Sequence, residues 1–163
     1  MARAFVGLGG NLGDAAATLP AAAQVLAGLP GTQGFVLSSL YRTPAWGRRD
    51  QPDFINAVAG FDTPLAPRAL LDALLAIEQR FGRTRAVDAG DRWGPRTLDL
   101  DLLLHGDLRV AQAGLCVPHP HLHQRAFALV PLLEIAPDAV IPGIGPAADA
   151  LAGVDRGGIE AVR

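Results

Sequence analysis

The chain has 163 residues and a net charge of −2, which predicts one domain and excludes a general attraction to nucleic acid or to anionic membranes. It contains no lysine, so a lysine nucleophile, a Schiff base and the lysine of a phosphate-binding loop are excluded. Cys116 is the only cysteine, and no apolar run reaches about 20 residues without helix breakers. We therefore expect a reduced, cytoplasmic protein without an internal disulfide, a cysteine metal cluster or a membrane span.

The order of apolar patterns predicts an α+β fold. In chain order, it predicts a strand at 4–8, a helix at 15–29, strands at 34–42 and 54–61, a helix at 67–81 and a strand at 97–105. The second helix is the clearest, because Leu70, Leu74 and Ile77 fall on one stripe. This order is typical of a ferredoxin-like β-α-β-β-α-β sandwich, with helices packed on one antiparallel sheet.

The rest of the chain carries weaker signals. The sequence at 107–110 indicates a short hairpin in which the chain reverses, and the sequence at 131–137 predicts a short helix between prolines. Gly, Pro and Ala then dominate, with one weak helix at 146–151. We expect residues 1–163 to form a single domain, with 143–163 as a peripheral C-terminal tail that has no catalytic part.

The segment around Asp99 and Asp101 carries the strongest chemical signal. Leucines alternate with Thr97, Asp99 and Asp101, so on a strand the two carboxylates share one face, with Cα atoms roughly 7 Å apart. Two like charges this close repel unless a cation lies between them, and hard divalent cations prefer carboxylate oxygens. The alternative is that the aspartates form the solvated face of an ordinary strand.

Arginines gather just before this segment, at Arg80, Arg83, Arg85, Arg92 and Arg96. They are either a solvated basic face or a site for a polyanionic ligand. The aspartate pair that follows favours the second interpretation, because carboxylates for magnesium beside arginines for phosphate indicate phosphoryl transfer.

Further polar segments are candidates for binding. The glycine-rich stretch 7–14 predicts a strand-to-helix turn, which is either structural or brings backbone N–H groups to an anion. The loop 43–53 is either a lid or a plain hairpin loop. Asn56 is either a satisfied polar group of a strand or a reader of a flat heterocycle's edge. In the histidine-rich stretch 117–123, a histidine that donates to phosphate is preferred to a zinc site.

Several of these segments together resemble the 6-hydroxymethyl-7,8-dihydropterin pyrophosphokinases of folate biosynthesis. The central block reads Arg92-Trp93-Gly94-Pro95-Arg96-Thr97-Leu98-Asp99-Leu100-Asp101. The other blocks are Tyr41-Arg42-Thr43-Pro44, Gln51-Pro52-Asp53-Phe54-Ile55-Asn56, Val117-Pro118-His119 and Pro131-Leu132-Leu133-Glu134-Ile135-Ala136-Pro137. The blocks follow one another in the family's order, which makes the resemblance specific.

The resemblance implies transfer of the β,γ-pyrophosphoryl group of ATP to the hydroxymethyl oxygen of the pterin, with release of AMP. Asp99 and Asp101 match the ligands of two Mg²⁺ ions that bind the triphosphate. The pterin lies between two aromatic rings, which map to Phe54 and Phe127, and Asn56 matches the amide that reads its edge. The implied pterin-binding residues are Thr43, Pro44, Trp46, Phe54, Asn56, Trp93, Asp99 and Phe127.

The resemblance also implies a nucleotide site and a catalytic set. The implied ATP-binding residues are Glu78, Arg92, Trp93, Arg96, Leu102, His119 and Arg125. Of these, Glu78 and Trp93 border the nucleotide pocket, and Leu102 contacts adenine. The implied catalytic residues are Arg85, Arg96, Asp99 and Asp101. Spacing alone makes Glu78 an ordinary exposed residue near a helix end.

Two other functions are compatible with parts of the pattern. An RNA-binding module would need exposed sheet aromatics and a basic face, and the net acidity and the aspartate pair argue against it. A magnesium-dependent phosphohydrolase would need a water-positioning base, which the sequence does not offer. We therefore expect ATP and the hydroxymethylpterin as substrates, no nucleic-acid or membrane partner, and a monomer.

Overall fold

The computed structural model describes residues 1–11, 13–44, 52–82 and 97–162. Its centre is an antiparallel sheet with the strand order β10-β3-β4-β1-β5, and β2 also pairs with β4. The strands are β1 (Ala2–Gly10), β2 (Gln33–Leu37), β3 (Tyr41–Thr43), β4 (Phe54–Thr63), β5 (Asp99–His105) and β10 (Glu160–Ala161). The predicted combination of helices with an antiparallel main sheet is confirmed.

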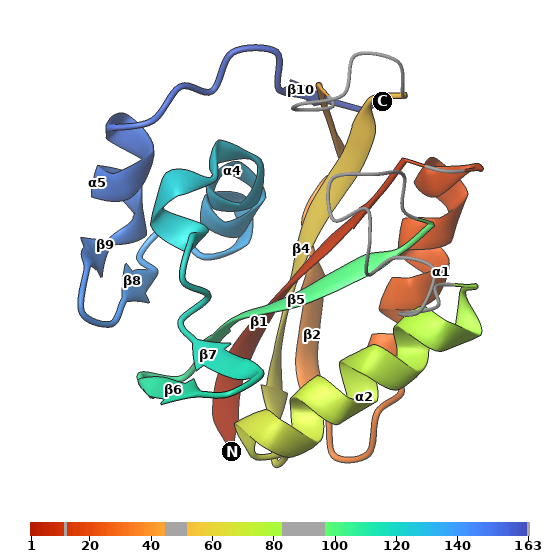
Figure 1. The fold of residues 1–163 in the computed structure, drawn as a ribbon, viewed down its shortest axis with the longest axis vertical. Coiled ribbons are helices and arrows are strands. Elements are labelled where there is room, and N and C mark those ends of the chain that lie inside the picture. Colours follow the sequence, from red (N-terminus) through yellow and green to blue (C-terminus); the bar gives the residue numbers. More distant parts are fainter. Residues whose placement is uncertain (12, 45–51, 83–96, 163) are drawn as a thin grey trace.

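Helices cover both faces of this sheet (Figure 1). On one face lie α1 (Ala15–Ala27) and α2 (Pro67–Arg80), and on the other lies α4 (Ala126–Ile135), with α5 (Ala147–Ala152) packed against the outer side of α4. Between these elements come the hairpins β6 (Val110–Gln112) with β7 (Leu115–Val117) and β8 (Val140–Ile141) with β9 (Gly145–Pro146), and a short 3-10 helix at Leu122–Gln124. None of the described helices combines the length and the apolar character needed to cross a membrane.

Two apolar cores join the layers, one on each face of the sheet. Leu74 of α2 and Leu100 of β5 belong to the core under α1 and α2, and Leu129 of α4 belongs to the other. Because successive side chains on β5 point to opposite faces, burial of Leu100 and Leu102 on the side of α1 and α2 directs Asp99 and Asp101 toward the α4 side. The predicted shared face of the two aspartates is confirmed.

The strand predicted at 34–42 is divided into β2 and β3, which both pair with β4. The break falls at Ser38, whose hydroxyl oxygen accepts a hydrogen bond from the backbone N–H of Val58 at 2.9 Å. Here a side chain replaces the backbone carbonyl of a regular ladder, so the strand can bend without leaving that N–H unsatisfied. The sequence does not predict this break, because a single serine within an apolar run does not change the hydrophobic pattern.

The helix predicted at 131–137 begins earlier, at Ala126, and contains Pro131. A proline within a helix removes one N–H donor, which here would have bonded the carbonyl of Phe127. That single loss is tolerated because the helix packs its apolar residues against the sheet. The early start matters for the site, because it places Phe127 in the first turn of α4.

The segment 143–163, expected to be peripheral, is built into the fold as far as residue 162. Ala147 of α5 is fully buried in the core that includes α4. Ala161 of β10 pairs with Tyr41 of β3, and the backbone N–H of Val162 donates to the carbonyl of Leu40 at 2.8 Å. The Gly- and Ala-rich composition hides this, because a six-residue helix and a two-residue strand are too short to show a period.

Candidate functional site

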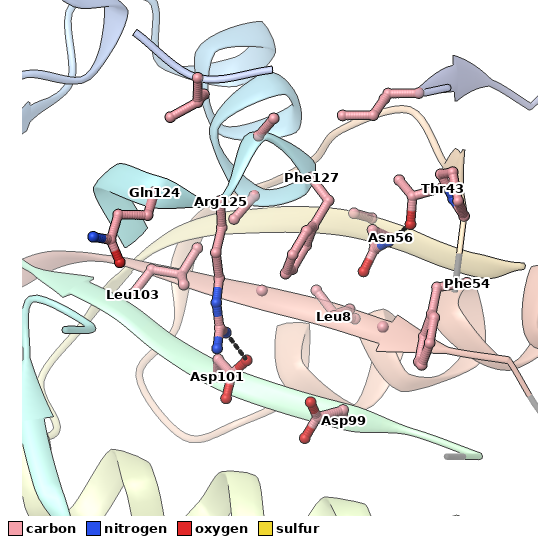
Figure 2. A pocket seen from close by; sticks show the side chains of 18 of the residues that line it. Leu8, Thr43, Phe54, Asn56, Asp99, Asp101, Leu103, Gln124, Arg125 and Phe127 are labelled. Carbon is pink, nitrogen blue, oxygen red and sulfur yellow. Dashed lines mark hydrogen bonds and ion pairs between the residues drawn. The ribbon is translucent and has the colours of Figure 1, made fainter. Parts of the chain in front are cut away.

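A cavity of about 610 Å³ lies between the sheet and the first turn of α4 (Figure 2). Strands β1, β3, β4 and β5 contribute to its walls, together with residues 124–128 and the C-terminal segment. Because β5 and β3 lie on opposite sides of β4 and β1 in the sheet, the aspartates of β5 and the residues of β3 mark two ends of one cavity. Its chemistry therefore differs from end to end.

Most of the described candidate residues line this cavity. They are Thr43, Pro44, Phe54, Asn56, Asp99, Asp101, Arg125 and Phe127. The candidates Trp46, Arg85, Arg92, Trp93 and Arg96 lie outside the described residues. Their roles stay predictions.

The aromatic end is defined by Phe54 and Phe127, whose rings lie on either side of the space above Leu8 (Figure 2). Both rings are half-buried, so each can offer a face to a ligand. Asn56 is 8% exposed and donates from Nδ2 to Oγ1 of Thr43 at 2.8 Å. This bond fixes the amide at the wall of the cavity, where it can read the polar edge of a flat ring.

A row of paired residues crosses the cavity floor. Asn56 of β4 lies opposite Gly9 of β1, and Gly9 lies opposite Asp99 of β5. Asn56 and Asp99 therefore stand two strand spacings apart, roughly 10 Å. Since Gly9 has no side chain, a flat ring can lie between the amide and the carboxylate.

Gly7 falls within the strand predicted at 4–8, whereas the expectation of a strand-to-helix turn over 7–14, either structural or near an anion, was wrong for Gly9. Both lie within β1 and line the cavity. Their spacing of two residues is the signal that could have placed them, because it removes side chains from one face of a strand.

Replacement of Gly9 by alanine is expected to weaken binding of the aromatic ligand. A Cβ at this position would lie 2.8 Å from Oδ1 of Asn56, so the amide would have to move. We expect Gly9→Ala to raise the dissociation constant of a flat-ring ligand about tenfold, with a smaller effect on an anion bound at the charged end. The comparison is Gly7→Ala, whose added methyl would meet Leu103 at an ordinary 3.5 Å. Equal effects of the two variants would contradict the positioning of Asn56 by Gly9.

At the opposite end, acidic and basic side chains meet. Nη1 of Arg125 lies 3.9 Å from Oδ2 of Asp101, and its guanidinium carbon lies 5.6 Å from the centre of the Phe127 ring. Asp99 points into the same space (Figure 2). This end thus offers carboxylate oxygens for a divalent cation and a guanidinium for an anion.

His119 stands near this charged end as a hydrogen-bond donor. Its Nδ1 accepts the backbone N–H of His121 at 3.1 Å, so a neutral ring carries its proton on Nε2. Burial, followed by the charges of Arg125 and His121, lowers the pKa of His119 from 6.5 to about 4, although Asp99 opposes the shift. The ring is therefore neutral near pH 7 and can donate one hydrogen bond from Nε2.

Two other candidates have their side chains away from the cavity. Glu78 is 5% exposed, so the expectation of an ordinary exposed residue was wrong, and its Oε2 accepts the backbone N–H of Leu100 at 2.8 Å. Leu102 is packed in the core with α1 and α2. Glu78 thus holds β5 against α2, beside the strand that carries the aspartates.

A polar brace, formed by Glu134 with Tyr41 and Ser39, joins α4 to the chain around β3. Glu134 accepts hydrogen bonds from the hydroxyl of Tyr41 at 2.5 Å and from the backbone N–H of Ser39 at 2.8 Å. Burial and the bond to Glu134 raise the pKa of Tyr41 to about 12. Burial would raise the pKa of Glu134, but the bonds from Tyr41 and Ser39 outweigh it and lower that pKa. The brace fixes Phe127 on α4 relative to Thr43 on β3.

Titration of the phenol tests this brace directly, because Tyr41 is the single tyrosine of the chain. After a rapid pH jump, we expect phenolate absorbance with a midpoint near pH 12 in the folded chain, against 10.0 in the unfolded chain. The stability that the bond provides is complete below pH 10.0 and is lost as pH rises through 12. Glu134→Gln should lower the midpoint, and a wild-type midpoint near 10 would contradict the brace.

Known proteins are similar in sequence to this chain along most of its length. A family model described as 7,8-dihydro-6-hydroxymethylpterin-pyrophosphokinase (HPPK) matches residues 5–137. The 2-amino-4-hydroxy-6-hydroxymethyldihydropteridine pyrophosphokinase of Methylorubrum extorquens is 47% identical over 162 residues, 99% of each chain. The protein of the same name from Pseudomonas aeruginosa is 45% identical and covers 97% of this chain and 95% of its own.

Solved structures agree on the fold. A crystal structure of Plasmodium falciparum HPPK-DHPS superposes with a TM-score of 0.65 over 93% of this chain, at 14% sequence identity. The match covers 43% of that longer chain, so this chain spans less than half of its length. At such low identity the likeness shows the fold alone, whereas the close relatives and the family model decide the membership. The chain belongs to the 7,8-dihydro-6-hydroxymethylpterin-pyrophosphokinase family.

Proposed function

We propose that this protein transfers the pyrophosphoryl group of ATP to the hydroxymethyl oxygen of 6-hydroxymethyl-7,8-dihydropterin, giving the pterin diphosphate and AMP, a step of tetrahydrofolate biosynthesis. The observation that carries the proposal is one cavity with two chemically different ends. A pair of phenylalanines with a fixed amide lies at one end, and a pair of carboxylates with an arginine lies at the other. The family membership supports the same reaction.

The pterin ring fits the aromatic end. A flat ring between Phe54 and Phe127 would gain stacking on both faces, while Asn56 reads its polar edge. The row from Asn56 through Gly9 to Asp99 sets the direction of the ring across the sheet. A ring held at Asn56 would extend its hydroxymethyl group toward Asp99 and Asp101.

The carboxylate pair fits magnesium bound together with ATP. Among the residues that the structure describes, no group of three or more acidic, histidine or cysteine side chains is placed to hold a metal ion. Two carboxylates suffice for Mg²⁺, because this ion takes its remaining oxygens from substrate phosphates and water. Asp99 and Asp101 would hold two Mg²⁺ ions, which supply charge neutralisation for the triphosphate and alignment for in-line attack.

The chain's own residues would position the phosphates and hold their charge. Arg125 beside Asp101 is placed to bind a phosphate oxygen, and neutral His119 can donate from Nε2. Arg85, Arg92 and Arg96 are proposed to stabilise the transferred group and the departing AMP. The loops 43–53 and 83–91 are proposed to close over the substrates and exclude water, with Trp46 lining the pterin site and Trp93 bordering the nucleotide pocket.

The bond changes balance without a covalent enzyme intermediate. The hydroxymethyl oxygen attacks the β-phosphorus, the bond from that phosphorus to the oxygen bridging the α-phosphate breaks, and AMP leaves with that oxygen. The hydroxyl proton goes to solvent or to a phosphate oxygen. Positioning and electrostatic stabilisation then account for catalysis.

The nucleotide product tests this proposal. The protein is incubated with ATP, Mg²⁺ and the reduced hydroxymethylpterin, and the products are separated, identified and quantified by mass spectrometry. We expect AMP and the pterin diphosphate in equal amounts, and no AMP without pterin. ADP with free phosphate would support a phosphohydrolase instead, and salt-sensitive RNA binding without turnover would support an RNA-binding module.

The ferredoxin-like description of the fold is also a proposal. It is supported by the run β1, α1, β2 with β3, β4, α2 and β5, in which β1 lies between β4 and β5. The monomeric state and the cytoplasmic location stay predictions.

A further inference from the structure

The C-terminal segment, residues 153–162, returns to the cavity after α5. Figure 1 shows it crossing from α5 to the edge of the sheet, where β10 pairs with β3. Two bonds fix its path: the N–H of Val162 donates to the carbonyl of Leu40 at 2.8 Å, and the N–H of Gly157 donates to Oδ1 of Asp155 at 2.8 Å. The segment is thus tied to the fold at its end and within its turn.

This segment forms part of the cavity surface. Val154, Asp155 and Ile159 line the cavity. Next to Ile159, Gly158 has a φ of +82°, and a Cβ there would lie 2.9 Å from Cγ of Pro44. The backbone therefore packs closely on Pro44, and Ile159, which is half-buried, is presented beside it.

The strand order places the C-terminal segment at the end of the cavity that is opposite to the aspartates. The aspartates belong to β5 at one edge of the sheet, and β10 lies at the opposite edge, beyond β3. In the pterin, the C6 hydroxymethyl group and the 2-amino group lie at opposite ends of the long axis of the fused ring. A ring that directs C6 toward Asp99 and Asp101 must direct its 2-amino end toward β3 and β10.

We propose that the C-terminal segment is the end wall of the pterin pocket, and that Ile159 is the side chain that limits the space beyond the 2-amino group. This inference rests on the proposed function and adds a specificity residue to it. The Ile159 side chain offers only apolar contact and takes up space that a longer substituent would need. The wall should therefore exclude pterins that carry an alkyl group on the 2-amino nitrogen.

Kinetics of Ile159→Ala with two substrates test the wall. With 6-hydroxymethyl-7,8-dihydropterin, we expect the KM of the pterin to rise about tenfold, because apolar contact is lost, while the KM of ATP stays within about twofold. With the analogue methylated on the 2-amino nitrogen, we expect the wild type to react poorly and the variant to improve. The ratio of kcat/KM for analogue over natural substrate should rise about tenfold or more.

Glu160→Ala is the matched control, because Glu160 is the exposed neighbour on β10 and does not line the cavity. It should leave both substrates unchanged. If Ile159→Ala fails to fold, Ile159→Val removes one methyl and should move the ratio in the same direction by a smaller factor. An unchanged ratio and an unchanged pterin KM in a folded Ile159 variant would overturn the inference while the wild type still makes AMP. Absence of AMP from the wild type would overturn the proposed function itself.

Discussion

Asp99→Ala and Asp101→Ala are each expected to abolish formation of AMP from Mg·ATP and the pterin, with kcat reduced by at least about a thousandfold. Each variant removes one of the two carboxylates that meet at the charged end of the cavity. Without it, a Mg²⁺ ion would lose a carboxylate ligand, and the less neutralised charge of the triphosphate would oppose the approach of the hydroxyl oxygen. Steady-state assays with AMP as the detected product measure the loss.

The fold should survive both substitutions. Asp99 and Asp101 are partly exposed, and the ion pair of Asp101 with Arg125 is long at 3.9 Å, so little stability depends on it. Asp107→Ala is the control, because this exposed aspartate follows β5 in the next turn. It should keep wild-type turnover. Near-normal turnover in either Asp99→Ala or Asp101→Ala, with unchanged thermal unfolding, would refute the assignment.

Phe127→Ala is expected to weaken binding of the pterin about tenfold to a hundredfold, which corresponds to the loss of one stacking face. The ring lines the aromatic end of the cavity opposite Phe54, whereas ATP is proposed to occupy the charged end. The dissociation constant of ATP should therefore change by less than about threefold. Isothermal titration calorimetry with each ligand separately measures both constants.

Phe35→Ala provides the comparison, because it removes a ring of the same size from the other face of the sheet. Phe35 stacks on Phe61 with ring centres 5.9 Å apart, in the core that contains α1 and α2. That variant should lower stability without changing pterin affinity. A larger effect of Phe127→Ala on ATP than on the pterin would count against stacking.

The parts of the site that follow from local pattern could be predicted from the sequence. Alternation of leucine and aspartate at 98–101 places the carboxylates on one face whatever the rest of the fold, because side chains on a strand alternate. The amphipathic stripe of α2 is local in the same sense. Thr43, Phe54 and Phe127, in contrast, were assigned through the family resemblance, since no spacing rule brings three distant segments to one cavity.

The parts that depend on tertiary contacts escaped prediction. Glu78 looks like a surface residue near a helix end, and only the approach of the Leu100 backbone makes it a buried acceptor. The C-terminal segment has no apolar period, and its place beside β3 depends on backbone pairing that many sequences could make. Gly7 and Gly9 lie between these two cases. Their spacing of two residues can be read from the sequence, but it indicates a cavity floor only once β4 and β5 are known to lie on either side of β1.

A crystal structure with a nonhydrolysable ATP analogue, the pterin and Mn²⁺ in place of Mg²⁺ tests the central claim most directly. The claim predicts two anomalous peaks about 4 Å apart, each about 2 Å from a carboxylate oxygen of Asp99 or Asp101, with the triphosphate and the hydroxymethyl group against them. A nucleotide bound elsewhere, or metal ions held without these two side chains, would contradict it.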